Sequence, residues 1–433
     1  NMSPGIFKVA SAAKKDPARP LLALAHHIDV EALRRAYGRI RKNAAVGVDE
    51  VTKEQYGANL EVNLRDLHAR LKSMRYRHQP IRRVFIEKEG GKQRPIGIST
   101  TEDKIVQESL RELLEAIYEP MFMECSYGFR PGRGAHDALR ALDNCVRGGK
   151  VNFVLEADLV SFFDRIDRKK LKELLGQRIA DKSLMRLIGK CLHVGVLDGE
   201  QEISPEQGTV QGSTLSPILA NVYLHYALDV WFETEVKPRM RGQAILIRYC
   251  DDFIMTFEHR DDAERVMEVL KKRMAQYGME LHPEKTRMLD FRRPSRFHEG
   301  HKGPGTFEFL GFLMLWKRGR KSGGWYMAMR TRRARLSRAK TAIYDWCRDH
   351  RHWRVKDQHA ALWKRIQGHF NYFGVRGNER SLSLVLEDAK RSWHKWLNRR
   401  SQRSHITWKR FVDLLDTYPF PEPKARRSLW ANS

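Results

Sequence analysis

Apolar positions along the first 290 residues alternate between helical and strand-like spacing. Helical spacing with strongly basic faces covers residues 29–75 and returns, with four apolar residues on one side, over residues 101–118. Between these helices, two strand-length runs at 81–87 and 93–98 flank the pair Gly90-Gly91, which predicts a β-hairpin. Further helix-like segments then alternate with two strands that end in acidic residues.

The last third of the chain has a different pattern. Breaks rich in Gly, Pro and charge at 292–305 and 317–324 enclose a short apolar run, 307–312, which predicts a strand. From Met327 onward the sequence is typical of helices, very basic and rich in tryptophan. We place the main boundary near residue 320 and expect the large aromatic residues beyond it to form the core of a small helical bundle. These residues are Trp363, Phe370, Tyr372, Phe373, Trp393, Trp396 and Trp408.

The charge of the chain points to a polyanionic partner. Among 433 residues, 80 are Lys or Arg and 53 are Asp or Glu, which gives a net charge of +27. This excess favours nucleic acid as the partner. A membrane is not expected, because no segment approaches the roughly 18 consecutive apolar residues of a spanning helix. The five cysteines include no C-x-x-C pair, so we expect a cytoplasmic protein, with the nucleoid as an alternative location.

The clearest chemical signal is a pair of acids inside an apolar, β-prone run. Asp251 and Asp252 interrupt residues 245–255, and carboxylates among such neighbours are costly unless they are paired, hydrogen-bonded or bound to metal. A hairpin with both acids at its tip would present their oxygens to a cation. The run 151–158 also ends in an acid, Asp158. The three carboxylates could hold two Mg²⁺ ions about 3.5–4 Å apart, as in two-metal phosphoryl transfer. The alternative is a solvated turn, since Asp favours turns.

Seven blocks in a fixed order resemble the reverse transcriptases of group II introns and their bacterial relatives, and the resemblance covers nearly the whole chain. The blocks are residues 86–98 (IEKEGGKQRPIGI), 126–133 (SYGFRPGR), 158–164 (DLVSFFD), 207–217 with 220–224 (QGTVQGSTLSP, ANVYL), 249–252 (YCDD), 281–286 (LHPEKT) and 309–312 (FLGF). Each block alone is a weak signal, whereas their order is specific.

The resemblance implies a right-hand polymerase of mixed α/β (α+β) fold. Residues 1–80 would form an N-terminal extension with a template-binding loop, 81–320 the fingers and palm with an antiparallel palm sheet, and 321–433 an all-helical, basic thumb or maturase-like region. The implied reaction is addition of dNTPs to a primer 3′-hydroxyl on RNA and DNA templates. The implied cofactor is Mg²⁺, two ions, with Mn²⁺ as a substitute. The expected partners are RNA template, DNA primer or RNA/DNA duplex, dNTPs and intron RNA, while the oligomeric state stays open.

The resemblance also assigns roles to individual residues. Asp158, Asp251 and Asp252 would be both the catalytic residues and the metal ligands, with Tyr249 and Cys250 as neighbours of the primer end. The nucleotide-binding residues would be Lys88, Arg94, Phe163, Gln211 and Lys285. Phe163 would collide with a ribose 2′-hydroxyl, whereas Phe162 fits a core position. Lys285 has an equal alternative as a cation at a helix C-terminus. Glu156, Asp164 and Asp167 are nearby acids that we do not expect to bind metal.

A basic helix is expected to follow the nucleic-acid backbone. It would present Arg332, Arg333, Arg335, Arg338 and Lys340, with Met327, Met329, Leu336 and Ile343 as a narrow buried stripe. The alternative is a merely solvated helix. A segment that resembles the family's RNA-contacting region follows at residues 364–374.

Two positions depart from the commonest family pattern. Cys250 stands where Ala is usual, and residues 210–213 read VQGS where PQGG is usual. We expect both to affect processivity or primer choice rather than the chemistry. The C-terminal cysteine/histidine pattern of a homing endonuclease is absent from the sequence, so no cutting of target DNA is expected.

The biological role stays open between several readings. The first is an intron-encoded reverse transcriptase and splicing cofactor, and the second is a host enzyme of the same type that acts in DNA repair or phage defence. A non-catalytic RNA-binding maturase is disfavoured by the three acids, and an RNA-dependent RNA polymerase by Phe163. The natural template and primer do not follow from the sequence.

Overall fold

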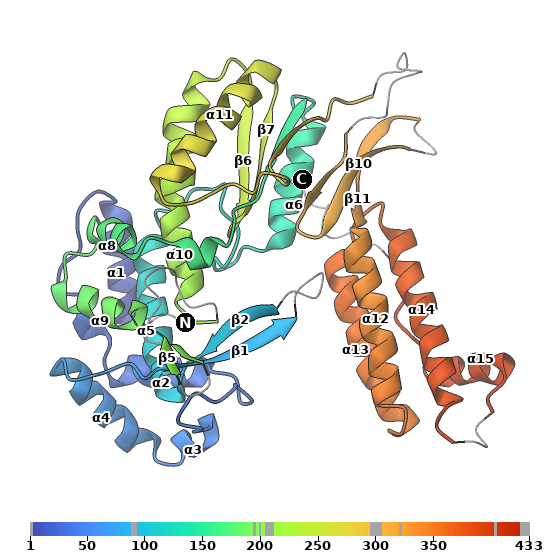
Figure 1. The fold of residues 1–433 in the computed structure, drawn as a ribbon, viewed down its shortest axis with the longest axis horizontal. Coiled ribbons are helices and arrows are strands. Elements are labelled where there is room, and N and C mark those ends of the chain that lie inside the picture. Colours follow the sequence, from blue (N-terminus) through green and yellow to red (C-terminus); the bar gives the residue numbers. More distant parts are fainter. Residues whose placement is uncertain are drawn as a thin grey trace.

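Three parts of the chain follow one another along the longest axis of the molecule: the N-terminal helices, a central antiparallel sheet and a C-terminal helical bundle (Figure 1). The computed structural model describes residues 3–87, 93–193, 196–198, 201–203, 212–294, 305–319, 323–401 and 405–424. In this described part, the longest apolar stretch of any helix falls short of what a membrane crossing requires. The expected mixture of helices and antiparallel sheet is confirmed.

The N-terminal part is built around α5 (Thr101–Tyr118), which has the bounds predicted from its spacing. Thr100 begins this helix, because its side chain accepts a hydrogen bond from the Asp103 backbone N–H. The helices around it are α1 (Pro4–Lys15), the short η1 (Ala25–His27), α2 (Val30–Arg39), α3 (Lys53–Gly57) and α4 (Leu60–Lys72). Helices α1 and α2 pack directly on α5, and the predicted helical character of residues 29–75 is confirmed for α2 and α4.

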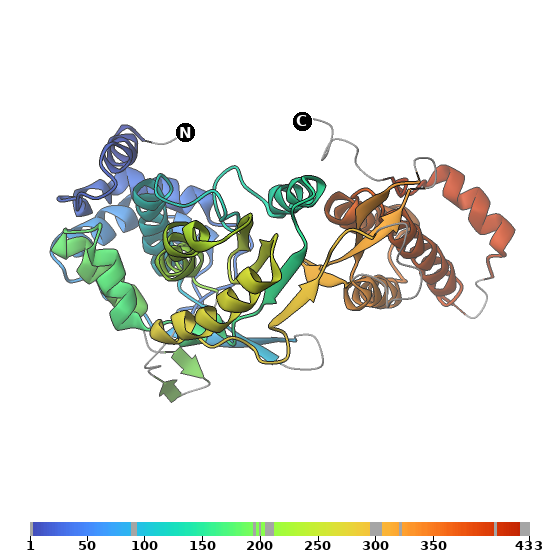
Figure 2. The same cartoon turned by 90° about the horizontal axis from the view of Figure 1, so that it is seen from above.

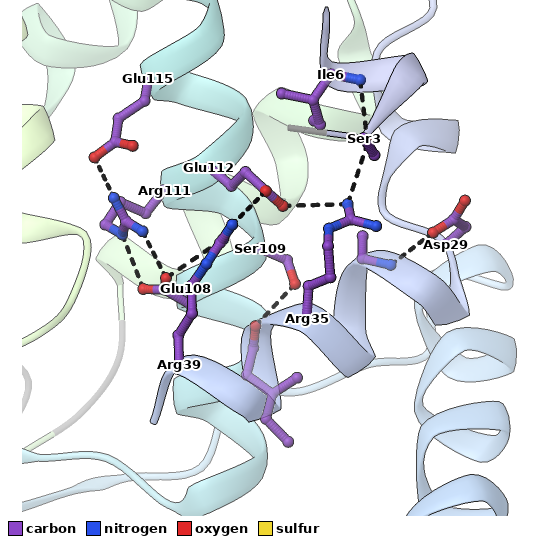
Figure 3. Close-up of polar contacts among 12 residues, drawn as sticks. Ser3, Ile6, Asp29, Arg35, Arg39, Glu108, Ser109, Arg111, Glu112 and Glu115 are labelled. Carbon is purple, nitrogen blue, oxygen red and sulfur yellow. Dashed lines mark hydrogen bonds and ion pairs between the residues drawn. The ribbon is translucent and has the colours of Figure 1, made fainter. Parts of the chain in front are cut away.

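A network of ion pairs joins α2 to α5 (Figure 3). The side chain of Glu112 is 7% exposed and accepts from Arg39 Nη2 at 2.7 Å and Arg35 Nη2 at 3.3 Å. Burial alone would raise the pKa of Glu112, but the two arginines more than offset it, and the pKa lies below its usual value. The network continues on α5, where Arg111 pairs with Glu108 and Glu115.

We expect Glu112→Gln to lower the free energy of unfolding by about 1–3 kcal/mol, because two arginines lose a charged acceptor. Since the folded-state pKa of Glu112 is lowered, its contribution is present above pH 4.5 and disappears as pH falls through the folded-state pKa. Denaturant unfolding of both proteins at neutral and acid pH measures this. Glu124→Gln is the control, since the Glu124 side chain is 90% exposed and its pair with Arg133 should contribute less than about 1 kcal/mol. Equal effects of the two substitutions at neutral pH would contradict the account.

Beside the N-terminal helices, a sheet with both parallel and antiparallel pairs has the strand order β2-β1-β4-β5. The predicted hairpin is confirmed as β1 (Ile81–Glu87) and β2 (Gln93–Ile98), which pair antiparallel. Strand β1 also pairs in parallel with β4 (Val196–Asp198), and β4 pairs antiparallel with β5 (Gln201–Ile203). Lys88 lies outside the described residues, and so does the Gly90-Gly91 turn.

The central sheet has the strand order β6-β7-β3-β8, with every neighbouring pair antiparallel. Its strands are β6 (Ala244–Tyr249), β7 (Asp252–Phe257), β3 (Phe153–Ala157) and β8 (Arg287–Asp290). Both acid-bearing runs of the sequence are strands, as predicted, and they belong to one sheet. Alternate residues serve two different cores: Phe253 and Met255 of β7 face one, and Ile254 faces the other.

Helices cover both faces of the central sheet (Figure 2). One face packs against α11 (Arg260–Gln276) and a continuous helical segment, residues 216–239. That segment consists of α10 (Ser216–Leu224), two π-helical stretches, η2 (His225–Asp229) and η3 (Phe232–Val236), and η4 (Lys237–Arg239). The other face packs against α6 (Ala135–Arg147) and a third sheet. The remaining helices here are α7 (Phe162–Arg165), α8 (Arg168–Gly176) and α9 (Lys182–Leu192).

The third sheet, β11-β10-β9, corrects two sequence expectations. The run 307–312 is not one strand: β9 (Phe307–Phe309) ends at a Leu310-Gly311 turn, and β10 (Phe312–Arg318) returns antiparallel. Helix does not begin at Met327, because Trp325–Thr331 forms β11, paired with β10. Met327 and Met329 are thus buried strand residues and not part of a helical stripe. The expected boundary at residue 320 falls between paired strands, and the domain division stays a prediction.

The C-terminal part is helical from Arg333, with α12 (Arg333–Asp349), α13 (Val355–Phe373), α14 (Glu379–Leu397) and α15 (Trp408–Thr417). Its core contains Phe370 and Trp393, as expected. Trp363 and Trp408 do not fit the core prediction, because they are 40% and 47% exposed. Trp408 nevertheless meets the ring of His394 on α14 edge-on at a centroid distance of 5.0 Å.

Candidate active site at the acidic hairpin

Asp251 and Asp252 lie at the tip of the β6–β7 hairpin, as the sequence predicted. Tyr249 pairs with Asp252, so Cys250 and Asp251 form a two-residue turn. Cys250 has φ +59°, a conformation that is unusual for a residue with a side chain. Its thiol is buried and donates to the Asp251 carboxylate, and burial followed by the Asp251 charge raises the pKa of Cys250. The Cys250 side chain thus contacts one of the two hairpin acids directly.

Asp158 follows β3 directly, on the strand next to β7. Its Oδ2 lies 2.5 Å from the ammonium Nζ of Lys285, and both side chains are partly exposed. Lys285 is not at a helix end: α11 stops at Gln276, and Lys285 lies in a turn that leads into β8. The alternative role of Lys285 as a helix-terminal cation is therefore wrong. The ion pair instead brings two of the predicted site residues together.

Asp252 lies in a strongly acidic environment. It is accessible to solvent, yet protein atoms surround it closely, and this desolvation is the main reason that its pKa rises to about 7. The charges of Asp251, Asp158 and Glu156 raise the pKa further. Leu310 opposes the rise, because its backbone N–H donates to the Asp252 carboxylate. A bound cation would favour the ionised form, so metal and proton compete for this carboxylate.

The Leu310-Gly311 turn brings the third sheet to the acidic hairpin. Both residues have positive φ, +51° and +82°, which is the two-residue hairpin turn that favours glycine. Leucine at such a φ is strained, and its N–H is the one that reaches Asp252. The Tyr372 hydroxyl of α13 donates to the Leu310 carbonyl at 2.9 Å. The C-terminal helices are thus connected to the hairpin acids through one turn.

The donor set fits a hard cation, although the described residues do not form a closed metal cluster. Among them, no three His, Cys, Asp or Glu side chains converge closely enough to hold an ion by themselves. The chemistry of the donors nevertheless suits Mg²⁺, which prefers oxygen and commonly takes further ligands from water and substrate phosphates. The mutual repulsion that raises the pKa of Asp252 would be relieved by a cation, as the Lys285 ammonium already does at Asp158.

A buried arginine that the sequence analysis did not single out holds the hairpin from below. Arg248 is fully buried, and each of its five N–H donors has an acceptor. Its Nε and Nη2 donate to Asp229 at 2.7 and 2.5 Å, Nη2 also to Ser126 Oγ at 2.8 Å, and Nη1 to Asn221 Oδ1 and the Cys250 carbonyl, both at 3.0 Å. The π-helical stretch η2 presents Asp229 to this network.

Gly128 packs against the backbone of the acidic turn. A Cβ at this position would lie 2.5 Å from the Cys250 backbone nitrogen, closer than real contacts allow. The Gly128 carbonyl accepts from Asn221 Nδ2 at 2.7 Å, and Asn221 also binds Arg248. Three of the sequence blocks, at 126–133, 220–224 and 249–252, therefore meet at one point. The polar residues of these blocks could have indicated this contact from the sequence, because buried polar residues need hydrogen-bond partners.

We expect Gly128→Ala to reduce nucleotide addition by about 100-fold, because the added methyl displaces the turn that presents Asp251 and Asp252, and displacement of about 1 Å at a reacting centre can have this effect. Single-turnover primer extension measures it. Gly134→Ala, in the same segment, is the matched control, since its Cβ would make only an ordinary 3.7 Å contact. Similar rates for the two variants would contradict the close packing.

The two adjacent phenylalanines differ as expected. Phe162 is 2% exposed and belongs to the core, whereas Phe163 is half-buried and meets the Phe162 ring edge-on at a centroid distance of 5.3 Å. Both lie in the short helix α7, five residues or fewer after Asp158. Phe163 is thus the more accessible of the two rings, as it must be if it is to collide with a ribose 2′-hydroxyl.

The structure describes only parts of the remaining residues that were predicted to bind the nucleotide. Gln211 and Val210 lie outside the described residues, and so does the side chain of Arg94, whose backbone pairs with Ile86 in the hairpin. Gly212 has φ +104°, and a Cβ there would lie 2.7 Å from the Gly97 carbonyl of β2. Glycine at 212 is therefore required by its own conformation and by this contact.

Two nearby acids have structural partners. Glu156 pairs with Arg287 at 2.9 Å and accepts from the Glu308 N–H, while Asp167 accepts from the Lys170 N–H at the start of α8. Glu156 influences Asp252 through its charge, and the expectation that neither acid binds metal stays a prediction.

The predicted basic helix is shorter than expected and only part of it is exposed. Arg332 precedes α12 and pairs with Glu308 at 2.8 Å, and Lys340 pairs with Asp388 at 2.8 Å. Arg333, Arg335 and Arg338 are exposed on the first turns of α12. Arg335 also lies beside the Leu310-Gly311 turn, since a Cβ added to Gly311 would be 3.8 Å from the Arg335 side chain.

The sequence matches a known protein family over the part that contains these residues. Residues 86–314 match the family described as reverse transcriptase (RNA-dependent DNA polymerase). The chain is 33% identical over 249 residues to the group II intron-encoded protein LtrA of Lactococcus lactis, a match that covers 55% of the chain and 41% of LtrA.

Two further relatives extend this picture. Protein YkfC of Escherichia coli is 35% identical over 240 residues, 48% of the chain and 62% of YkfC. An uncharacterized 91 kDa protein in the cob intron of Schizosaccharomyces pombe is 45% identical over 163 residues, 38% of the chain and 20% of that protein. The matched region thus spans between a fifth and about three fifths of these curated relatives.

Proposed function

The chain belongs to the reverse transcriptase family and is of the group II intron type, and from this premise we propose that it adds dNTPs to a primer 3′-hydroxyl on an RNA template and releases pyrophosphate. DNA templates are proposed as a second substrate. The observation that carries the proposal is the tight turn that exposes Asp251 and Asp252 on a strand adjacent to Asp158. The carboxylates gathered there, whose charges together with desolvation raise the pKa of Asp252, suit a cation-dependent reaction.

In this proposal Asp158, Asp251 and Asp252 would hold two Mg²⁺ ions, which would supply Lewis-acid activation of the primer hydroxyl and positive charge at the leaving pyrophosphate. The remaining contributions come from the chain itself. The Cys250 thiol orients the Asp251 carboxylate, and the Leu310 N–H orients the Asp252 carboxylate. Arg248 holds the Cys250 carbonyl and thereby the turn that carries Asp251. Lys285, which pairs with Asp158 in this structure, would bind the phosphates of an incoming nucleotide.

The parts of a right-hand polymerase are assigned as follows. Residues 1–80 form the N-terminal extension with a template-binding loop, and the fingers and palm occupy residues 81–320, with the central sheet as the palm. Residues 321–433 include the thumb, whose helices start at Arg333. Lys88, Arg94 and Gln211 bind the nucleotide, Tyr249 borders the primer end, and the basic residues of α12 bind backbone phosphates.

We expect Phe163→Ala to admit ribonucleotides, because removal of the ring opens space for a 2′-hydroxyl. The preference for dNTP over rNTP should fall by about 10- to 100-fold, in the range of a lost steric contact. Competing dNTP and rNTP incorporation at one template position measures the preference. Phe162→Leu is the control, since the buried Phe162 ring should affect stability alone. Unchanged discrimination in Phe163→Ala would remove Phe163 from this role.

A second candidate function is assistance to intron splicing, and one observation favours it. Relatives include the intron-encoded LtrA and a protein named nuclear intron maturase 2 of Arabidopsis thaliana, 28% identical over 181 residues. The exposed arginines of α12 would suit structured RNA, which proteins recognise by shape and phosphates. Self-splicing of intron RNA from the surrounding gene, measured with and without the protein, tests this role. A role in DNA repair or phage defence without an intron is the alternative.

A further inference from the structure

A cavity of about 160 Å³ lies between α6 and the third sheet, and neither Asp158 nor the two hairpin acids line it. In Figures 1 and 2, α6 lies beside the β10–β11 hairpin. The lining combines two kinds of side chain. Three arginines, Arg147, Arg293 and Arg376, meet three aromatic residues, Trp316, Trp325 and Tyr326, above a floor of Val146, Met327 and Met329.

The size and the walls of this cavity suit one flat ring. An engineered cavity of about 150 Å³ in another protein accommodates benzene, so 160 Å³ has room for one aromatic ring. Trp325 and Tyr326 are half-buried, which leaves part of each ring accessible. The Arg376 guanidinium lies 5.4 Å from the centre of the Tyr326 ring, a stacked cation–π arrangement. Indole and phenol rings of this kind stack on nucleobases.

The polar groups define which rings fit. Asp143 is 6% exposed, and its Oδ2 lies 2.6 Å from Nη2 of its ion-pair partner Arg147. A carboxylate accepts up to four hydrogen bonds, so acceptor capacity for a base N–H remains. Arg147, Arg293 and Arg376 are exposed at the rim. Arg293 uses its Nη2 on the Trp325 carbonyl, and a guanidinium has five donors.

We propose that this cavity binds one nucleotide, with the base between the aromatic walls and Asp143 and the phosphate on the rim arginines. The nucleotide is either free or an unpaired residue of a nucleic-acid strand, since the chemistry of the two is the same. The site is distinct from the acidic hairpin: Trp316 lies four residues along β10 from Phe312, roughly 13 Å at about 3.3 Å per residue. The proposal does not depend on polymerase activity.

The test measures binding without divalent cations, so that the acidic hairpin does not contribute. Equilibrium binding of a fluorescent single-stranded oligonucleotide and of a labelled nucleoside monophosphate is compared for wild type, Tyr326→Ala and Arg376→Ala. Each substitution should weaken binding by about 5- to 140-fold, the equivalent of 1–3 kcal/mol for a stacked base. Tyr326→Phe, which keeps the ring, and Arg186→Ala, which removes an exposed arginine of α9, should bind as the wild type does.

Photocrosslinking gives the position. An oligonucleotide that contains 4-thiothymidine should crosslink to the peptide with Trp325 and Tyr326, also in the Asp251→Asn protein. Binding of the monophosphate would identify a free nucleotide, and binding of the oligonucleotide alone would identify a strand residue. Crosslinks only to other peptides, or equal affinities of Arg376→Ala and Arg186→Ala, would overturn the proposal. Loss of primer extension with this binding retained would affect the proposed polymerase alone.

Discussion

Asp251→Asn is expected to lower the rate of nucleotide addition by about 100- to 10,000-fold, while the affinity for template–primer stays within about threefold. A neutral amide would remove one of the charges proposed to hold the metal ions. Metal stabilisation of developing charge is worth several kcal/mol, and each 1.36 kcal/mol is a factor of ten in rate. The turn itself should persist, because the Arg248 network binds the Cys250 carbonyl and not the Asp251 side chain.

Asp413→Asn, an exposed carboxylate of α15, is the matched control for the loss of one negative charge. Single-turnover extension with saturating dNTP and Mg²⁺ separates the chemical step from binding. If Asp251→Asn extends primers at the rate of Asp413→Asn, the hairpin acids are not metal ligands. An equal loss of template–primer affinity and rate would instead assign Asp251 to nucleic-acid binding.

The second large effect is expected at Arg248. Arg248→Met should lower the free energy of unfolding by about 3–5 kcal/mol, because it leaves the carboxylate of Asp229 buried without a partner. Thermal or denaturant unfolding measures this loss. The double variant Arg248→Met/Asp229→Leu should recover much of the stability, since replacement of a buried ion pair by apolar residues is often neutral.

The activity of the double variant distinguishes a positioning role from a purely structural one. Without Arg248, the Cys250 carbonyl, Ser126 Oγ and Asn221 Oδ1 all lose a donor. The hairpin tip should then be displaced, and nucleotide addition should stay about 100-fold low even though the protein is stable. Recovery of both stability and rate in the double variant would show that Arg248 serves folding alone.

Local signals in the sequence were sufficient to predict α5 and the hairpin that carries Asp251 and Asp252. Helix α5 has both a capping threonine and a regular apolar face, and the β6–β7 hairpin has strands on either side of a two-residue turn. These features depend on residues close in the chain. Asp251 and Asp252 therefore lie at a hairpin tip, and Asp158 at the end of a strand, as the pattern predicted, whereas the adjacency of β3 and β7 did not follow from it.

Elements that depend on distant partners were harder to predict. Strand β11 contains Met327, Ala328 and Met329, which favour helices, and a basic helix follows it directly. Its extended form comes from pairing with β10, which the local pattern does not encode. The same error affected the predicted basic helix, because Arg332 precedes α12 as its N-cap residue.

The Arg248 network was missed for a related reason. Its acceptors come from residues 126, 221, 229 and 250, so no window of sequence contains the network. The same holds for Leu310, whose N–H reaches Asp252 from a different sheet. Within the sequence, the remaining signal was the presence of Arg and Asp among apolar residues of β6 and η2, which indicates that they pair.

Extension of a DNA primer on an RNA template by the wild-type protein tests the central claim most directly. The reaction contains dNTPs and Mg²⁺, with EDTA in a parallel sample and Asp251→Asn protein in another. We expect templated extension only by the wild-type protein with Mg²⁺. No extension under any condition, by a protein that still binds the RNA template tightly, would contradict this expectation and favour a non-catalytic role in RNA binding.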